Sequence, residues 1–292
     1  MGACPGLQDP DGSDLDRYQE VTSVATPEVG SVVSLWHYPV KSMMGEELNA
    51  SLVTERGLLG DRAFALIDRE TGKVVSAKEP RKWAKMFDFR ANYGAPPKGD
   101  GLPPVRITFP DGTIATSELP NLSDVLSREL GREVALAASA PDAPSLEEYW
   151  PDIEGLAFRE VVTDEAMPPG TFFDLAVVHV LTTATIDHLR ELYPDGRFEV
   201  RRFRPNVVVA TEQRGFVEND WIGHTLAVGD EVRLEVTGPC PRCVMTTLPQ
   251  YDLPKDPGIL RAAAKHNEAN VGVYASVVRG GTVGRGDVVS LE

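Results

Sequence analysis

Cysteine is scarce in this chain, with three among 292 residues, which is too few for a disulfide framework. The chain also has no apolar run as long as a membrane helix, and its N-terminus has no basic segment followed by an apolar one, so we expect neither a membrane span nor a signal peptide. Basic residues are outnumbered by acidic ones, 29 to 44, for a formal net charge of −15. An acidic surface repels phosphate backbones, so nucleic acid is not an expected partner. We expect a cytoplasmic protein with one large or two ordinary domains.

Two of the cysteines, Cys240 and Cys243, stand at C-x-x-C spacing, which is typical of half a zinc site or of a redox dithiol. A structural zinc site needs four ligands. The third cysteine, Cys4, lies in a polar N-terminal segment, and His224 and His266 are not at a recognised ligand spacing. The pattern therefore gives little support to zinc.

Three other interpretations of this pair remain open. A thioredoxin-like dithiol begins a helix, whereas residues 244–247 (VMTT) favour a strand. Two buried cysteines that act as small hydrophobic residues are the common case inside cells. In the last interpretation Cys243 is a lone thiolate ligand to a soft metal, and the neighbouring Arg242 favours its ionised form.

Strand-like runs and turns dominate the sequence, and the clearest are residues 31–36, 48–53, 63–67, 73–76, 105–109 and 207–210. They predict a mostly β fold with a few helices (α+β). Residues 1–29 are acidic and are predicted to form a disordered tail. Residues 30–138 are predicted to form a smaller β-rich domain. Residues 139–155, rich in Pro, Asp and Glu, are predicted to link it to a second domain at 156–292, whose strands at both ends favour a barrel.

A possible anion site follows the apolar run at 175–181. Thr182 and Thr183 stand between this run and a segment with helical spacing. Threonine hydroxyls and free amides at a helix start bind anions, although plain helix capping explains the same pattern. His179, inside the apolar run, is predicted to be a core histidine, and Asp174 beside the run is a candidate general acid by location only.

A basic cluster precedes the strand at 207–210. Arg201 and Arg202 are predicted to face solvent, whereas Arg204 stands directly before Pro205 and the strand and is predicted to be buried. A buried arginine needs an anion. That anion is either a carboxylate of the chain or a ligand phosphate.

Five phrases in order resemble the MOSC family, which is named for the C-terminal domain of molybdenum cofactor sulfurase. They are YPVKS at 38–42, GLLGDR at 57–62, RPN at 204–206, WIG at 221–223, and PRC with a following TT at 241–247. The first two resemble the β-rich domain that precedes the MOSC domain in larger members. The resemblance implies a β-barrel-like MOSC domain preceded by a smaller β-rich domain.

The same resemblance implies a molybdenum cofactor (Mo-molybdopterin) and a set of site residues. It makes Cys243 the molybdenum ligand and the catalytic residue. It also implies that the pterin cofactor is held, largely at its phosphate, by the positions Lys41, Ser42, Arg62, Thr182, Thr183, Arg204 and Asn206.

The resemblance to amidoxime-reducing components implies an oxidoreductase that reduces N-hydroxylated or N-oxide compounds by oxygen-atom transfer. LPQ at 248–250 stands where those proteins have an acidic stretch, which leaves the small-molecule substrate open. Electrons are expected from a separate electron-transfer protein, because the cysteines of a C-terminal iron–sulfur domain are missing. The alternative is a sulfur carrier or cofactor-binding protein in molybdenum cofactor metabolism, with Cys243 as a persulfide supplied by a pyridoxal-phosphate-dependent cysteine desulfurase.

Overall fold

The computed structural model describes residues 1–2, 27–99 and 101–292. Cys4 and most of the predicted tail lie outside the described residues, and the first strand already begins at Glu28. Strands dominate the described residues, which contain five α-helices, so the predicted fold class is confirmed. No helix among these residues is long and apolar enough to cross a bilayer.

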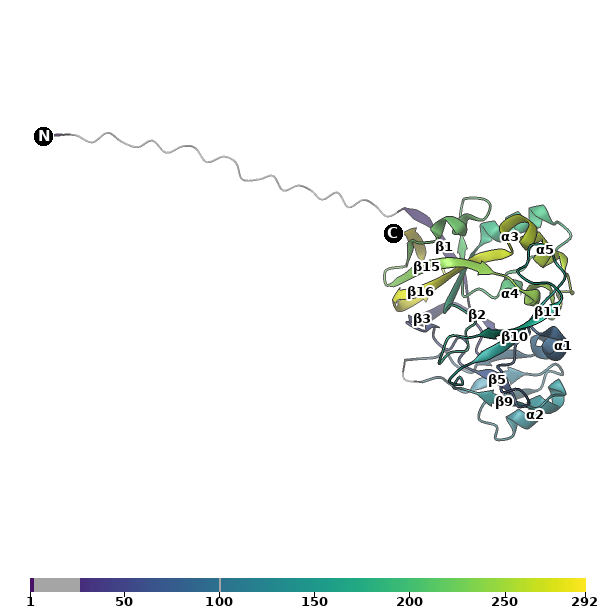
Figure 1. Ribbon diagram of the computed structural model, residues 1–292. Helices are drawn as coiled ribbons and strands as arrows, with labels where there is room; N and C mark the ends of the chain where they lie inside the picture. The colour runs from purple at the N-terminus through teal and green to yellow at the C-terminus, as the bar shows by residue number, and fades with distance from the viewer. Residues whose placement is uncertain (3–26, 100) are drawn as a thin grey trace.

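Seven strands form a closed barrel in the order β13-β12-β16-β15-β14-β18-β1, which closes because β13 also pairs with β1. Their bounds are β1 Glu28–His37, β12 Val178–Thr182, β13 Val207–Ala210, β14 Thr225–Val228, β15 Val232–Pro241, β16 Asn270–Arg279 and β18 Val288–Leu291. Figure 1 shows this barrel in the upper part of the molecule. All neighbours are antiparallel except β12 and β13. The first strand of the chain therefore completes a barrel built from the second half.

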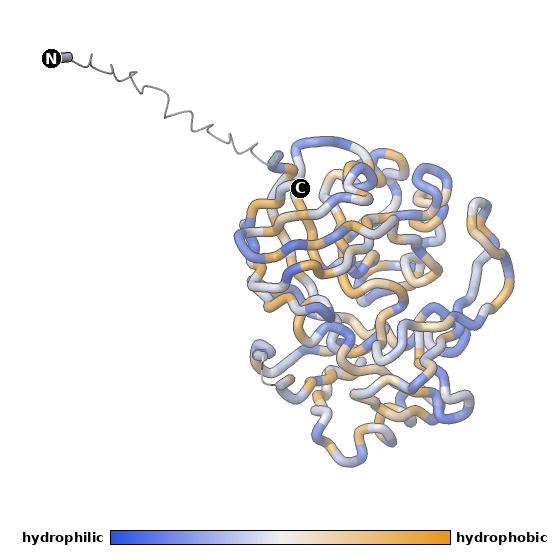
Figure 2. The backbone as a smooth tube through the Cα atoms, turned by 60° about the vertical axis from the view of Figure 1, so that its left-hand side comes forward, coloured by the Kyte–Doolittle hydropathy of each residue, from blue (hydrophilic) through white to orange (hydrophobic). Residues whose placement is uncertain are grey.

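The barrel forms because its strands alternate buried and exposed side chains, which places one row inside. In β15, Val232, Leu234 and Val236 are buried while Glu235 between them is exposed. Figure 2 shows the resulting changes between apolar and polar residues along the strands. The interior is filled mainly by valine and leucine, including Val32 and Leu35 of β1.

Three helices pack together beside the barrel: α3 (Thr183–Leu192), α4 (Val200–Phe203) and α5 (Gly258–Asn267). Ile186 and Leu189 of α3 share a buried cluster with Phe203 and Ile259. A 3₁₀-helix, η2 (Val217–Trp221), lies against α3 and β16. This second core packs α3 and α4, which follow β12, against α5, which follows the cysteines.

The smaller unit below the barrel contains short sheets and two helices (Figure 1). Its elements are β5 Ala65–Asp68, α1 Pro80–Trp83, η1 Ala84–Asp88, β6 Arg90–Tyr93, β7 Val105–Thr108, β8 Ile114–Thr116, α2 Leu122–Leu130 and β9 Val134–Ala137. The strand predicted at 73–76 makes only a single bridge, of Val74 with Ile67, and β5 pairs with β9. Val244, Met245 and Leu248 from the other half join the core of this unit. The cysteine segment therefore lies at the junction of the two halves.

Residues 139–155, predicted as a linker, contain strand β10 (Ser145–Trp150), which forms a hairpin with β11 (Val161–Ala166). The hairpin is fixed to the smaller unit, because the amide of Tyr149 donates to the carbonyl of Lys78 at 2.8 Å. A further sheet, β17-β3-β4, joins the C-terminal strand β17 (Gly281–Gly284) to β3 (Ala50–Thr54) and β4 (Gly57–Leu58), and β2 (Glu46–Leu48) extends β1. The two halves therefore share strands across their boundary.

Candidate functional site

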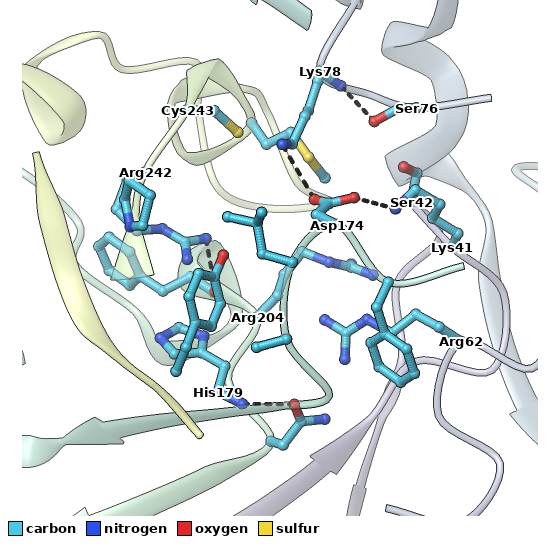
Figure 3. Close-up of a pocket in the computed structure, with 18 residues that line it drawn as sticks. Lys41, Ser42, Arg62, Ser76, Lys78, Asp174, His179, Arg204, Arg242 and Cys243 are labelled. Atoms are coloured by element: carbon cyan, nitrogen blue, oxygen red, sulfur yellow. Dashed lines mark hydrogen bonds and ion pairs between the residues drawn. The ribbon is translucent and has the colours of Figure 1, made fainter. Parts of the chain in front are cut away.

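Residues from both halves line one pocket at the junction, which we call the cationic pocket. It has a volume of about 700 Å³, including space open to solvent. Six of the eight residues predicted for the site line it: Lys41, Ser42, Arg62, Arg204, Asn206 and Cys243. Figure 3 shows Lys41, Ser42 and Arg62 from the first half facing Arg204 and Cys243 from the second. Residues that are distant in the sequence therefore meet as the predictions require.

Cys243 directly follows the distorted end of β15. The pairing of β15 with β16 shifts register twice near Gly238 and Pro241, which is consistent with prolines that cannot donate to a ladder. Residues Val244–Thr247 then form a 3₁₀-helix, η3, so the predicted strand at this position is wrong. A short turn of helix ends the strand here and presents the Cys243 sulfur to the pocket.

Arg242 favours an ionised Cys243 as expected, but burial of the thiol outweighs this effect. Burial raises the pKa of the Cys243 thiol to about 11, with the Glu148 carboxylate adding to this effect and with Lys78 and Arg242 opposing it. The guanidinium of Arg242 contacts the other cysteine instead, with Nη1 at 2.6 Å from the Cys240 Sγ. Both cysteines are free thiols, so Cys243 is protonated at neutral pH in the ligand-free pocket.

Five basic side chains line the pocket, and Asp174 is the single carboxylate among its lining residues. Asp174 bridges Lys41 and Lys78, as Figure 3 shows. Burial works against this carboxylate, but the two lysines hold the pKa of Asp174 well below its usual range. Asp174 is therefore ionised and cannot donate a proton at neutral pH, contrary to its candidate role as a general acid.

Two of the five basic residues have no carboxylate partner among the described residues. Arg204, only 6% exposed, donates from Nη1 to the carbonyl of Met43 at 2.7 Å and stacks 4.0 Å from the centroid of the Tyr38 ring. Burial, with Arg62 nearby, lowers the pKa of Arg204 to about 10. The Nε of Arg242 is buried without any hydrogen-bond partner in the described chain. Such charges are costly unless an anion binds to them.

Three of the seven non-glycine residues with left-handed backbone in the described chain line this pocket. Ser42, Arg62 and Arg204 have left-handed conformations, with φ of 64°, 46° and 55°, which side chains other than glycine rarely adopt. Each lies at a turn where the chain must bring its side chain to the pocket wall. Strain of this kind persists where surrounding contacts fix it and is typical of functional sites.

Two predicted pocket residues use their polar groups within the protein. The Asn206 amide donates to Asp61 at 2.9 Å and accepts from the backbone of His179 at 3.1 Å, while the Ser42 hydroxyl accepts from Ala77 at 3.1 Å. Both therefore shape the wall of the pocket. His179 is buried as predicted, and burial lowers its pKa to about 3, so its imidazole is neutral.

Thr182 and Thr183 lie outside the cationic pocket. The Thr182 side chain caps α3 by accepting from the amide of Thr185, and it donates to the buried carboxylate of Glu218 at 2.6 Å. Thr183 lines a separate acidic hollow beside Asp187. The structure thus supports the capping alternative for this pair, because Thr182 ends β12 whereas His179, earlier on the same strand, faces the pocket.

Arg202 was predicted to face solvent but is fully buried. Its guanidinium donates to four backbone carbonyls, of Arg197, Thr246, Leu248 and Pro254, at 2.8–3.2 Å. The residues around the arginine cluster in the sequence do not indicate that Arg202 is buried. Arg202 fixes the loop after Cys243, whereas Arg204 points to the pocket.

The lining residues that were not predicted for the site include Lys78, Arg242 and Tyr274. Lys78 and Tyr274 have no local motif around them and reach the pocket only through long-range packing, whereas Arg242 lies in the matched PRC phrase. No group of three or more His, Cys, Asp or Glu side chains in the described residues is arranged to hold a metal ion. Within this part of the chain, the donor set is a single thiol surrounded by cations.

Comparisons with known proteins agree with this arrangement. The MOSC domain matches residues 170–290 and the MOSC N-terminal beta barrel domain matches residues 29–102. Mitochondrial amidoxime reducing component 2 from Macaca fascicularis is 27% identical over 237 residues, which are 76% of this chain and 67% of that protein. Molybdenum cofactor sulfurase from Bos taurus is 22% identical over 299 residues, 94% of this chain and 33% of that protein.

Among solved structures, the YUAD protein from Bacillus subtilis aligns with 90% of this chain and 95% of that chain at 12% identity and a TM-score of 0.47, too weak a likeness to carry an argument. The two family matches together span most of the described chain, and both halves contribute to the pocket. The chain therefore belongs to the MOSC family, with a MOSC N-terminal beta barrel domain preceding the MOSC domain.

Proposed function

We propose that the cationic pocket binds the molybdenum cofactor with Cys243 as the metal ligand, and that the protein reduces N-hydroxylated or N-oxide compounds. One observation carries this proposal: Arg204 and Arg242 are largely enclosed cations without a carboxylate partner in the described chain, in the same pocket as a lone thiol. The chain as a whole is strongly acidic. Its relatives named as amidoxime reducing components support the reaction class.

The pocket residues fit the parts of this cofactor. Arg204 and Arg242 offer donors to its phosphate, because arginine binds phosphate through charge-assisted hydrogen bonds that are strong when desolvated. Lys41, Arg62 and Lys78 already have carboxylate partners. They add positive potential around the anion and need no new partner.

Cys243 fits the metal. A thiolate is a soft ligand that suits transition metals, and metal coordination removes the proton of a thiol even when its pKa is raised. When bound, the cofactor supplies a two-electron redox centre for oxygen-atom transfer. The protein then contributes binding, orientation and local electrostatics.

The reaction needs a supply of protons as well as electrons. Cleavage of the N–O bond consumes two electrons and two protons, and the oxygen leaves as water. Asp174 holds no proton at neutral pH, but Tyr274 keeps one, because burial and the neighbouring Cys240 raise the pKa of its hydroxyl well above its usual value. We propose Tyr274 as the hydrogen-bond donor to the substrate oxygen, and a separate electron-transfer protein as the source of electrons.

The sulfur-carrier alternative finds less support in the pocket. Accepting a persulfide requires an attacking thiolate, and the raised pKa keeps Cys243 protonated at neutral pH. Cys240, the other thiol, is fully buried. A cysteine desulfurase would therefore meet a poor acceptor in the cofactor-free protein.

The test uses protein from a host that makes the cofactor. Wild-type protein should contain about one molybdenum per chain and reduce benzamidoxime with an artificial electron donor. Cys243→Ser replaces the soft ligand with a normally protonated hydroxyl, so activity should vanish even where the pterin is retained through its phosphate. Cys240→Ser is the matched control and should keep most of its molybdenum and activity. Equal losses in both variants, or an active Cys243→Ser protein, would overturn the assignment.

A further inference from the structure

A second pocket adjoins the cationic pocket, and we call it the hairpin pocket because β10 and β11 form one of its walls. Its volume is about 1130 Å³, including space open to solvent. The two pockets share six lining residues: Lys78, Asp174, Leu175, Pro241, Arg242 and Tyr274. The two pockets therefore lie side by side and share part of their walls. Leu175 at their boundary is 64% exposed.

The two pockets have opposite chemistry. Among the residues that line only the hairpin pocket there are three carboxylates, of Glu148, Glu165 and Glu268, and no basic side chain. The remaining lining includes Leu146, Trp150, Leu156 and Met167. A phosphate-bearing group therefore suits the cationic pocket, and an apolar group with positive charge suits the hairpin pocket.

Two of these carboxylates, of Glu165 and Glu268, have no basic partner among the described residues, and Glu165 is the one that lies on the same hairpin as Trp150. Its Oε1 accepts a hydrogen bond from the Thr163 hydroxyl at 2.6 Å. That hydroxyl in turn accepts from the indole Nε1 of Trp150 at 2.8 Å. Glu148, by contrast, accepts a hydrogen bond from Lys78 Nζ at 2.9 Å and forms an ion pair with it. The hydrogen-bonded row along the hairpin holds the Glu165 carboxylate beside an aromatic ring in the same pocket.

We propose that the hairpin pocket binds the body of the substrate and that Glu165 makes the enzyme prefer N-hydroxylated compounds with an apolar, positively charged body. This inference rests on the proposed function and adds the substrate class. Trp150 supplies an aromatic surface that favours such cations. Tyr274 and Arg242, which line both pockets, mark the place where the reacting N–OH group meets the cofactor.

Three variants of the full-length protein test the assignment. Glu165→Gln removes the charge and keeps the shape. Asp164→Asn is the matched control, because the neighbouring residue points to the opposite face of the hairpin and pairs with Lys73. Ala157→Phe narrows the pocket at an exposed position outside the strands, which should tolerate a larger side chain.

Binding is measured first, by calorimetry with benzamidine as a cation that cannot be reduced and with benzamide as its neutral counterpart. Wild-type protein and Asp164→Asn should bind benzamidine better than benzamide. Glu165→Gln should weaken benzamidine binding about tenfold, the lower range for a hydrogen bond to a charged group because the pocket is open to water. Ala157→Phe should weaken both ligands.

Kinetics then connect the pocket to the reaction. With 4-(aminomethyl)benzamidoxime, Glu165→Gln should raise KM about tenfold with little change in kcat. With 4-carboxybenzamidoxime KM should fall, and with the small acetamidoxime it should not change. Molybdenum content should stay at the wild-type level in all three variants.

The outcomes separate this inference from the proposed function. Selective benzamidine binding that depends on Glu165, in a protein without molybdenum or reductase activity, would support the pocket and refute the proposed function. Reductase activity with no preference for the cationic substrate, or equal effects of Glu165→Gln and Asp164→Asn, would refute the inference and leave the proposed function standing.

Discussion

Replacement of Arg204 by methionine should have opposite effects on the stability of the cofactor-free protein and on cofactor retention. Burial lowers the pKa of Arg204 from the usual 12.5 to about 10, which corresponds to a cost of about 3 kcal/mol for holding the charge in the folded state. This cost applies fully below pH 10, because the arginine is charged in both folded and unfolded states there. It is relieved only as the pH rises from about 10 to 12.5, where the unfolded chain binds more protons.

Methionine removes that cost and also removes some favourable contacts. Loss of the contact between the guanidinium and the Tyr38 ring costs about 1–2 kcal/mol, and the left-handed backbone at residue 204 is equally strained with either side chain. The buried Met43 carbonyl also loses its donor, which costs about 1 kcal/mol. The cofactor-free Arg204→Met protein should therefore be as stable as the wild type at pH 7, or more stable by up to about 1 kcal/mol. Cofactor affinity should instead fall about ten- to a hundredfold, the effect of losing a charged hydrogen bond.

Arg202→Met is the matched control for this experiment. Arg202 is equally buried, but its four backbone partners satisfy it and it does not line the pocket. Its removal leaves buried carbonyls without donors, so the free energy of unfolding should fall by about 3 kcal/mol or more. Stability is measured by urea denaturation of protein from a host that lacks cofactor synthesis, and retention by molybdenum content after dialysis of loaded protein. Equal destabilisation by the two substitutions, or full molybdenum in Arg204→Met, would refute the reasoning.

Three further predictions concern titration and capping. In cofactor-free protein, alkylation of Cys243 by iodoacetamide should accelerate about tenfold per pH unit up to a pH near 11; a plateau near pH 8 in mass-spectrometric rate measurements would contradict the raised pKa. Because its pKa is depressed, Asp174 stabilises the fold above about pH 4 and loses this effect on acidification. Thermal midpoints between pH 6 and 3 should therefore fall more steeply for wild type than for Asp174→Asn. Thr182→Ala should cost about 1 kcal/mol through the lost cap while molybdenum content is unchanged; a lower content would place this threonine in the cofactor site.

Short sequence patterns predicted those strands whose formation depends mainly on neighbouring residues. The strand-like runs predicted at 31–36 and 207–210 form part of β1 and all of β13. The strand predicted at 244–247 failed because its apolar residues insert into the core of the smaller unit, a tertiary contact that overrides β propensity. The same holds for 139–155, whose linker-like composition does not show the pairing of β10 with β11.

In the candidate site, too, some features were predicted from short sequence patterns, whereas others depend on tertiary packing. Arg204 was predicted to be buried from its place before a core strand, and the structure confirms this. The threonine motif was correctly read as a helix start, but it lies beyond the end of β12 that faces the pocket, and strand direction cannot be read from a motif. Lys78 and Tyr274 reach the pocket through packing between distant segments, which one sequence does not reveal.

The closure of the barrel by β1 has a consequence for biosynthesis. Ser31 of β1 pairs with Val288 of β18. This edge of β1 therefore stays unpaired until β18 has been synthesised. The ribosome releases the chain from the N-terminus onward, and Lys41 and Arg62 are synthesised long before Cys243. A nascent chain therefore exposes an unpaired strand edge, which favours chaperone protection. A ligand that contacts both halves of the shared pocket can therefore bind only after Cys243 and Tyr274 have been synthesised.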